Sequence, residues 1–214
     1  GMLRLAGVRA ADLAAQFGTP LYVIDETEVR SRARQARTAF DEAAAAHGTT
    51  AHVYYAGKAL LTTAIARWVT DEGLALDVCS AGEFAVALAA GIAPARIGYH
   101  GNNKSVAEIT HAVALGVGSM VIDSFTEIDR VATAAAEAGT VQSVRLRVNS
   151  GVHAETHDFL ATAHEDQKFG FALNQAEAAV ARIRSHSSLQ CGGLHCHIGS
   201  QIFGTAGFEE AAAR

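Results

Sequence analysis

The sequence has little that would direct a protein to a membrane or to nucleic acid. None of its apolar runs approaches the roughly 20 residues that a membrane-spanning helix needs. Its 17 Lys and Arg residues are fewer than its 22 Asp and Glu residues, and the formal net charge is −5. The arginine-rich stretch VRSRARQARTAF, residues 29–40, therefore fits the solvent face of a helix better than a nucleic-acid-binding stripe. We expect neither a membrane nor a nucleic acid as partner.

Cysteine is also scarce. Cys79, Cys191 and Cys196 are odd in number, lie inside apolar segments and lack the spacing of a disulfide framework or a zinc knuckle. We therefore expect reduced, buried thiols. The N-terminus lacks the order of a signal peptide, and Gly1 before Met2 resembles a tag residue. These features together predict a cytoplasmic protein.

The order of apolar segments predicts an α/β fold. An amphipathic stretch, RAADLAAQFG, precedes a break at Gly18 and Pro20, and PLYVID (20–25) is then predicted as a strand. Apolar strands that alternate with alanine-rich helices indicate parallel pairing through helical crossovers. Six strand candidates follow this pattern: HVYYA (52–56), LALDV (74–78), RIGYH (96–100), SMVID (119–123), VRLRV (144–148) and GGLHCHI (192–198). The predicted helices include EFAVALAAG (83–91), VAEITHAVALG (106–116) and TEIDRVATAAAEAG (126–139), each ending in Gly.

Polar residues at the strand ends favour a TIM-type (β/α)8 barrel over an open doubly wound sheet. A barrel gathers the carboxyl ends of all its strands around one mouth, whereas an open sheet concentrates function at one switch point. No G-x-G-x-x-G motif supports a dinucleotide site. Six strand–helix units are two fewer than a barrel needs, and GFEEAAAR (207–214) is predicted as the start of the sixth helix. The strand-end residues are Lys58; Asp77 and Ser80; His100, Asn102 and Asn103; Asp123 and Ser124; Arg147 and Asn149; His197 and Ser200.

Lys58 is the first candidate for chemistry. It ends the apolar run of AHVYYAGKAL (51–60), between small residues, Gly57 and Ala59, that leave room around it. A lysine held partly away from water favours the neutral amine, which condenses with aldehydes and ketones. An exposed lysine at a strand end is the alternative interpretation.

The motif HCHIGSQ is the second candidate. On a strand, His195 and His197 would face the same side and could bind a metal ion. Alternatively, one histidine could pack against a planar cofactor ring, with Gly199 and Ser200 binding an anion at the start of the next helix. Either histidine could also be a hydrogen-bonded core residue, and the spacing leaves these three alternatives open.

Two further segments carry polar groups. In DVCSAGEF, Ser80 and Glu83 have the spacing of a helix capping box, whereas Asp77 could pair with Lys58 or orient a substrate. The long segment after the fifth strand holds His153, His157 and His164 at separations that suit no common metal site. We interpret it as a loop that contacts substrate, because long loops in compact domains are usually functional.

The motifs together resemble those of the fold type III pyridoxal-phosphate decarboxylases. The resemblance covers essentially the whole chain, and HCHIGSQ favours the diaminopimelate branch over ornithine decarboxylases, arginine decarboxylases and alanine racemase. It implies decarboxylation of meso-2,6-diaminopimelate to L-lysine and CO2, with other fold type III decarboxylases or racemases and a non-catalytic module as alternatives. The motifs are FGTPLYVID, YYAGKA, DVCSAGE, HGNNKS, RVNSG, THDFLATAHEDQKFGF and GLHCHIGSQI.

The resemblance also implies residue roles. Lys58 would bind pyridoxal 5'-phosphate as a Schiff base, His197 would stack on the pyridine ring, and Ser200 would bind the phosphate. The positions that line the cofactor and the lysine would be Asp77, Glu83 and Arg147, with His195 behind them and no metal ion.

The resemblance further implies an assembly larger than this chain. Residues 1–25 would join a C-terminal β-domain that this chain lacks, and residues 26–214 would form an incomplete barrel. The family acts as a homodimer on a small amino-acid substrate. We therefore expect the chain to be an N-terminal portion of an enzyme, with little activity of its own.

Overall fold

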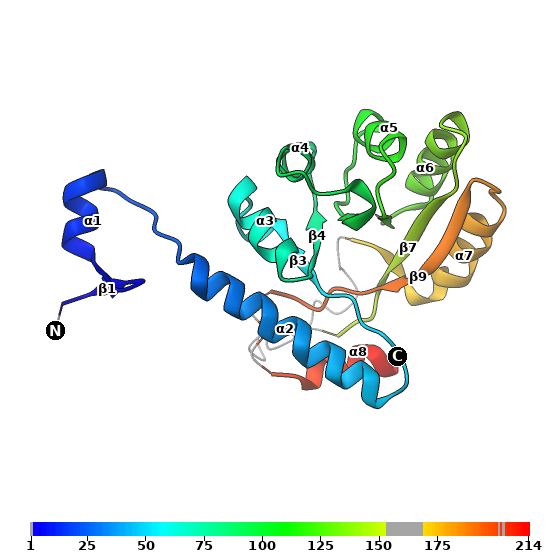
Figure 1. The fold of residues 1–214 in the computed structure, drawn as a ribbon. Coiled ribbons are helices and arrows are strands. Elements are labelled where there is room, and N and C mark those ends of the chain that lie inside the picture. Colours follow the sequence, from blue (N-terminus) through cyan, green and yellow to red (C-terminus); the bar gives the residue numbers. More distant parts are fainter. Residues whose placement is uncertain (1, 153–168, 201, 203) are drawn as a thin grey trace, which may run out of the picture. The chain divides into compact units, whose positions relative to one another are not determined.

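The computed structural model describes residues 2–152, 169–200, 202 and 204–214, and its ribbon is drawn in Figure 1. By packing, the chain divides into two units. Unit 1 comprises Gly1–Asp77 with Ala85–Ile92, and unit 2 comprises Val78–Phe84 with Ala93–Arg214. Strand β4 (Ala75–Val78) and helix α4 (Ala81–Ala89) run across the division.

Unit 1 begins with a small hairpin that the sequence did not reveal. Strands β1 (Arg4–Leu5) and β2 (Val8–Arg9) pair antiparallel around Ala6 and Gly7, whose φ angles of 49° and 79° suit a tight two-residue turn. Helices α1 (Ala10–Phe17) and α2 (Glu26–Ala46) follow. The predicted arginine-rich helix is confirmed within α2, where Arg30 forms ion pairs with Asp71 and Glu72.

The rest of unit 1 holds the first parallel pair. Strand β3 (Tyr54–Ala56) leads into the 3-10 turn η1 (Gly57–Ala59) and helix α3 (Thr63–Asp71), and β3 then pairs parallel with β4. The core of this unit includes Ile65 and Val69 of α3 and Leu76 of β4, each at most 2% exposed.

The prediction of a strand at PLYVID was wrong. Residues 20–25 form no strand, and Tyr22 is 98% exposed. A strand requires a partner for its backbone N–H and C=O groups, and no described residues pair with this segment. Its β-branched and aromatic composition is therefore not sufficient to make it a strand.

Unit 2 contains a parallel sheet that carries most of the predicted strand ends. Strand β5 pairs with β6, β6 with β7, and β7 with both β8 and β9, all in parallel. Figure 1 shows α5, α6 and α7 side by side along one face of these strands. The elements are η2 (Pro94–Arg96), β5 (Ile97–Tyr99), α5 (Val106–Ala114), β6 (Ser119–Ile122), α6 (Phe125–Glu137), β7 (Gln142–Asn149), β8 (Phe171–Ala172), η4 (Leu173–Gln175), α7 (Ala176–Arg184), β9 (Leu189–His195) and α8 (Ala206–Ala213).

The six predicted strands from 52 to 198 are confirmed, with shifted ends, and the parallel α/β class is confirmed with them. Strand β8 was not predicted, because two residues are too short to give a periodic pattern. Three glycines were predicted to end helices, and all three have the positive φ angles typical of that position. The angles are 83° for Gly91, 77° for Gly116 and 64° for Gly139. None of the described helices is long and apolar enough to cross a membrane.

Three successive helices begin with the same four-residue pattern, S-x-x-E. In each, the serine Oγ accepts a hydrogen bond from the glutamate N–H at 3.2 Å. The serine thereby satisfies one of the backbone donors left open at a helix start. The pairs are Ser80 and Glu83 in α4, Ser105 and Glu108 in α5, and Ser124 and Glu127 in α6.

The expectation of buried thiols was wrong for two of the three cysteines. Cys79 and Cys196 are exposed and Cys191 is half-buried, and all three are free. Cys79 directly follows β4 and Cys196 directly follows β9, so both lie just past the segments that the helices cover.

Packing at Gly118 gives a prediction about stability. A Cβ atom at Gly118 would lie 2.1 Å from the Ala95 carbonyl oxygen, so the backbone must shift in Gly118→Ala. We expect the free energy of unfolding to fall by about 1–3 kcal/mol, as for other overpacked sites. Gly82→Ala is the matched control, because the nearest atom to its Cβ is Ser80 Oγ at 3.9 Å. Urea unfolding followed by circular dichroism compares the two, and equal stabilities would contradict the close contact.

Candidate active site

Lys58 lies directly beyond the carboxyl end of β3, as the sequence predicted. It occupies the middle of η1, where Gly57 is buried and Lys58 itself is exposed. Of the two interpretations of this lysine, the structure therefore supports the exposed lysine at a strand end. The Tyr55 hydroxyl donates a hydrogen bond to the Leu60 carbonyl oxygen at 2.9 Å, which closes the turn that carries Lys58. Burial raises the pKa of Tyr55, so the phenol remains a donor.

Asp77 lies on the strand next to β3. Its register partner in β3 is Ala56, two residues before Lys58, and its side chain alternates along β4 with the buried side chains of Leu76 and Val78. The sequence thus brings Asp77 and the start of the Lys58 turn to the same end of one parallel pair.

Glu83 performs the capping role that its spacing indicated. Its N–H donates to Ser80 Oγ, and its carboxylate accepts a hydrogen bond from the Cys79 N–H at 2.7 Å. In a standard capping box the Glu83 carboxylate would accept a hydrogen bond from the Ser80 N–H, so here its donor lies one residue earlier in the chain. Glu83 is half-buried at this position.

The prediction that His195 and His197 share one strand face was wrong. Strand β9 ends at His195, and the exposed His197 lies in the segment that follows. Ser200 is also exposed and precedes α8, which begins only at Ala206, so it does not lie at a helix start. Among the described residues, no three His, Cys, Asp or Glu side chains gather as metal ligands.

His195 occupies a partly buried position on the sheet. Its ring meets the ring of His100 edge to face, with centroids 4.8 Å apart. Its Nδ1 is buried and has no hydrogen-bond partner within the described part of the chain. Burial, and then electrostatic interactions with His100 and Arg147, lower the pKa of His195 from 6.5 to about 3. His195 is therefore neutral at physiological pH.

Arg147 is held by several contacts of different kinds. It lies on β7 in register with His195 of β9, and its side chain is 15% exposed. Its Nε lies 3.6 Å from Asp123 Oδ1, and its guanidinium carbon lies 5.4 Å from the centroid of the Phe169 ring. A Cβ at Gly170 would lie 2.8 Å from the Arg147 carbonyl oxygen, so glycine is required there.

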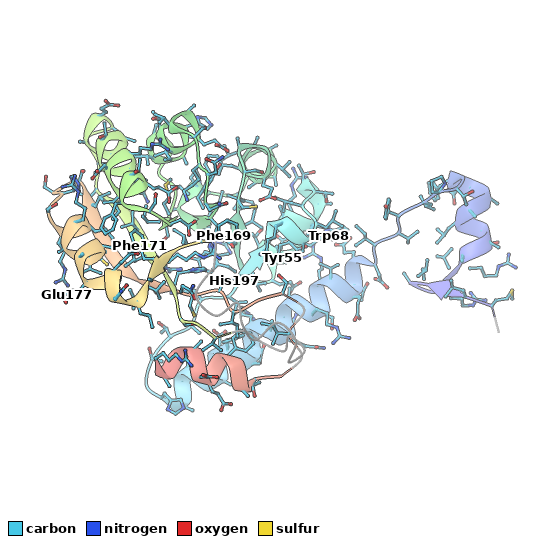
Figure 2. All side chains as sticks on the ribbon, turned by 180° about the vertical axis from the view of Figure 1, so that it is seen from behind. Tyr55, Trp68, Phe169, Phe171, Glu177 and His197 are labelled. Carbon is cyan, nitrogen blue, oxygen red and sulfur yellow. The ribbon has the colours of Figure 1, made fainter. Side chains whose placement is uncertain are left out.

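Figure 2 labels four residues of unit 2, among them Phe169, whose ring lies over the Arg147 guanidinium. Phe169 and Phe171 flank Gly170 on the segment that leads into α7, and His197 lies on the segment after β9. The exposed Glu177 of α7 points away from them. The ring of Phe171 packs edge to face on Phe125 at 5.0 Å, which anchors this segment to α6.

Sequence reasoning missed two buried charged residues next to this group. Lys104 and Glu127 are 3% and 5% exposed, and their charged atoms lie 2.9 Å apart. The S-x-x-E pattern could have located Glu127, but no local pattern marks Lys104 as buried. The predicted substrate loop with His153, His157 and His164 lies outside the described residues.

The chain belongs to the family described as pyridoxal-dependent decarboxylase, pyridoxal binding domain, whose model it matches over residues 26–214. Over its whole length it is 55% identical to diaminopimelate decarboxylase of Mycobacterium leprae, covering 44% of that protein. It is 53% identical to that of Mycobacterium tuberculosis, covering 47%. The chain thus spans about half the length of the curated relatives that it matches.

Solved structures agree with this assignment. Diaminopimelate decarboxylase from M. jannaschii aligns with a TM-score of 0.85 at 30% identity, covering 98% of this chain and 49% of that one. The enzyme from Helicobacter pylori, complexed with L-lysine, aligns with a TM-score of 0.83 at 28% identity, covering 94% and 50%. These comparisons confirm the predicted fold type III class, whose cofactor domain is TIM-barrel-like, and pyridoxal phosphate as the family's cofactor.

The lowered pKa of His195 predicts a specific dependence of stability on pH. Above about pH 6.5 the imidazole is neutral in both native and unfolded chains, so its contribution to stability is fully present. As the pH falls from 6.5 towards the native value of about 3, only the unfolded chain gains a proton. Stability then falls by up to about 1.4 kcal/mol per pH unit from this residue.

Urea unfolding between about pH 7 and pH 5 measures this dependence, with His195→Asn as the comparison. The variant should lose stability less steeply on acidification, because asparagine does not titrate. Identical slopes for the two proteins would show that His195 titrates normally in the native state.

Proposed function

We propose that this chain is the cofactor-binding portion of a decarboxylase that converts meso-2,6-diaminopimelate to L-lysine and CO2. The observation that carries the proposal is the 55% identity, over the entire chain, to a protein named diaminopimelate decarboxylase. The lysine/ornithine decarboxylase from Vibrio vulnificus is only 21% identical, a likeness that concerns the fold alone. Substrate and activity are inferred from relatives of about twice the length.

The residues at the strand ends fit a pyridoxal cofactor chemically. Lys58 has an exposed primary amine, which an aldehyde can reach, in a turn closed by Tyr55. Beyond β9, Gly199 adopts a φ of 137° beside the exposed hydroxyl of Ser200, which suits close approach of a phosphate group. Asp77 and Arg147 add one charge of each sign at strand positions. Unit 1 thus offers an amine that suits an aldehyde, and unit 2 offers groups that suit an anion.

Each residue has a role in the proposed reaction. Lys58 would hold the cofactor covalently, Ser200 its phosphate, and His197 one face of its ring. When bound, pyridoxal phosphate supplies a sink for the electron pair left by departing CO2. Arg147 keeps a fixed positive charge, because Asp123 and the Phe169 ring restrain its guanidinium. His195, neutral near pH 7, adds no second positive charge beside Arg147.

Other parts of the sequence-based hypothesis stay predictions. The homodimer, the cytoplasmic location and the domain division at residue 25 belong to them. CO2 release from meso-diaminopimelate, ornithine, arginine and lysine would decide the substrate, using a version of the protein extended to the length of its relatives. If the extended protein prefers another of these amino acids, the chain belongs to the decarboxylases specific for that amino acid. Cofactor binding without CO2 release would favour a non-catalytic module.

The role of Lys58 gives a direct test. The sequence contains three lysines, Lys58, Lys104 and Lys168, so an adduct can be assigned unambiguously. After incubation with pyridoxal phosphate and removal of the excess, we expect a retained absorbance band. Borohydride reduction and peptide mapping should then locate the pyridoxyl group on Lys58.

Lys58→Arg is the matched variant, because it keeps the positive charge but removes the amine that condenses with an aldehyde. It should lose both the band and the adduct. A pyridoxyl group on Lys104 or Lys168, with Lys58 unmodified, would overturn the assignment. The buried, ion-paired Lys104 is the internal control for nonspecific labelling.

A further inference from the structure

Lys104 is a buried lysine that the proposed chemistry does not use. It follows β5 in the segment HGNNKS, and its side chain is 1% exposed. Its Nζ donates to the carbonyl oxygens of Gly101 and Val121, the latter at 2.7 Å, and forms an ion pair with Glu127 Oε1 at 2.9 Å. These contacts satisfy all three ammonium donors.

Glu127 links this ammonium to the end of β6. One carboxylate oxygen meets Lys104, and the other accepts a hydrogen bond from the Asp123 N–H at 2.8 Å. Burial raises the pKa of Glu127, while the charge of Lys104 opposes that rise. Without the ammonium, the buried carboxylate would lose its compensating charge, and its hold on the Asp123 backbone would weaken.

Asp123 carries the connection to the site. Both of its carboxylate oxygens are buried, and neither has a hydrogen-bond partner among the described residues. Its ion-pair partner is Arg147, with Nε 3.6 Å away. Because the Asp123 carboxylate has so few contacts of its own, its position is set by the position of the Asp123 backbone. Since Glu127 holds that backbone, a shift at Lys104 reaches Arg147 through two intermediate residues.

We propose that Lys104 is a positioning residue for Arg147: its ammonium fixes Glu127, Glu127 fixes the backbone of Asp123, and the Asp123 carboxylate orients the guanidinium. This inference rests on the proposed function in assigning Arg147 to the cofactor site. The relay itself is a property of unit 2 and can be measured without the cofactor.

The decisive variant is the double substitution Lys104→Met/Glu127→Leu. Replacing both members of a buried ion pair by apolar residues of similar size often leaves a fold as stable as before, or more stable. The double variant therefore removes the relay while keeping the fold. Ile128→Ala is the matched control, because Ile128 is fully buried next to Glu127 in α6 but has no part in the relay. It should lower stability without moving Arg147.

The readout is the Arg147 Nε–H signal in 15N-edited NMR spectra, assigned with Arg147→Lys. In the native protein and in Ile128→Ala we expect a resolved signal that exchanges slowly with water. In the double variant we expect exchange to be about tenfold faster, corresponding to loss of one charged contact. Asp123→Asn should have the same effect. An unchanged signal in a folded double variant would overturn the proposal, because the pair would then be purely structural.

Pyridoxal phosphate titration separates this inference from the proposed function. If the native chain binds the cofactor, the double variant should bind it about tenfold more weakly and Ile128→Ala should not. Equal affinities for the native protein and the folded double variant would contradict the positioning role. If the native chain binds no cofactor, the proposed function fails, whereas the NMR comparison still decides whether Lys104 positions Arg147.

Discussion

The arrangement of the site in unit 2 depends on the alternation of side chains along β7. Val144, Leu146 and Val148 are at most 7% exposed, whereas Arg145 and Arg147 lie on the opposite face of the strand. A slip of one residue would exchange the two faces and bury both arginines under the helices. The apolar contacts therefore fix not only the strand but also the side from which Arg147 acts.

The alternation along β7 places the Arg147 guanidinium in a position that is only 15% exposed. The contacts around it compensate for this loss of hydration. Arg147 is opposed by the Asp123 carboxylate and covered by the Phe169 ring, while its neighbour His195 is neutral. Removing one partner of a buried ion pair generally destabilises a protein more than replacing both partners by apolar residues, because it leaves an uncompensated buried charge. The group behaves as a unit, so single substitutions in it are expected to have effects beyond the residue changed.

The sequence predicted the parts of the fold that depend on local pattern. Strand β6 is buried at all four residues and was recognisable as a short apolar run, whereas α6 was recognisable from the period of its apolar stripe. The segment PLYVID has an equally strand-like composition but no pairing partner in the described chain, and it is not a strand. Composition predicts the tendency of a segment, whereas hydrogen-bond partners decide the outcome.

The candidate site was predictable in the same uneven way. Lys58 was located beyond β3 because a lysine after an apolar strand is unusual, whereas its exposure was one of two interpretations that the sequence left open. His197 was expected on a strand, yet the strand ends two residues earlier at His195. Strand ends are set by the last hydrogen bond that a neighbour provides, and that information lies outside the motif itself.

The three S-x-x-E helix starts show why a motif cannot settle the role of a residue. Glu108 caps α5 and also accepts hydrogen bonds from Ala81 N–H and the Tyr99 hydroxyl, whereas Glu83 accepts from Cys79 N–H. Glu127 has the same spacing but meets a buried ammonium from a loop 23 residues earlier. That one contact gives its carboxylate a fixed countercharge and ties the start of α6 to the loop after β5. The difference between a cap and a member of a charged relay thus arises from tertiary contact, which the four-residue pattern does not contain.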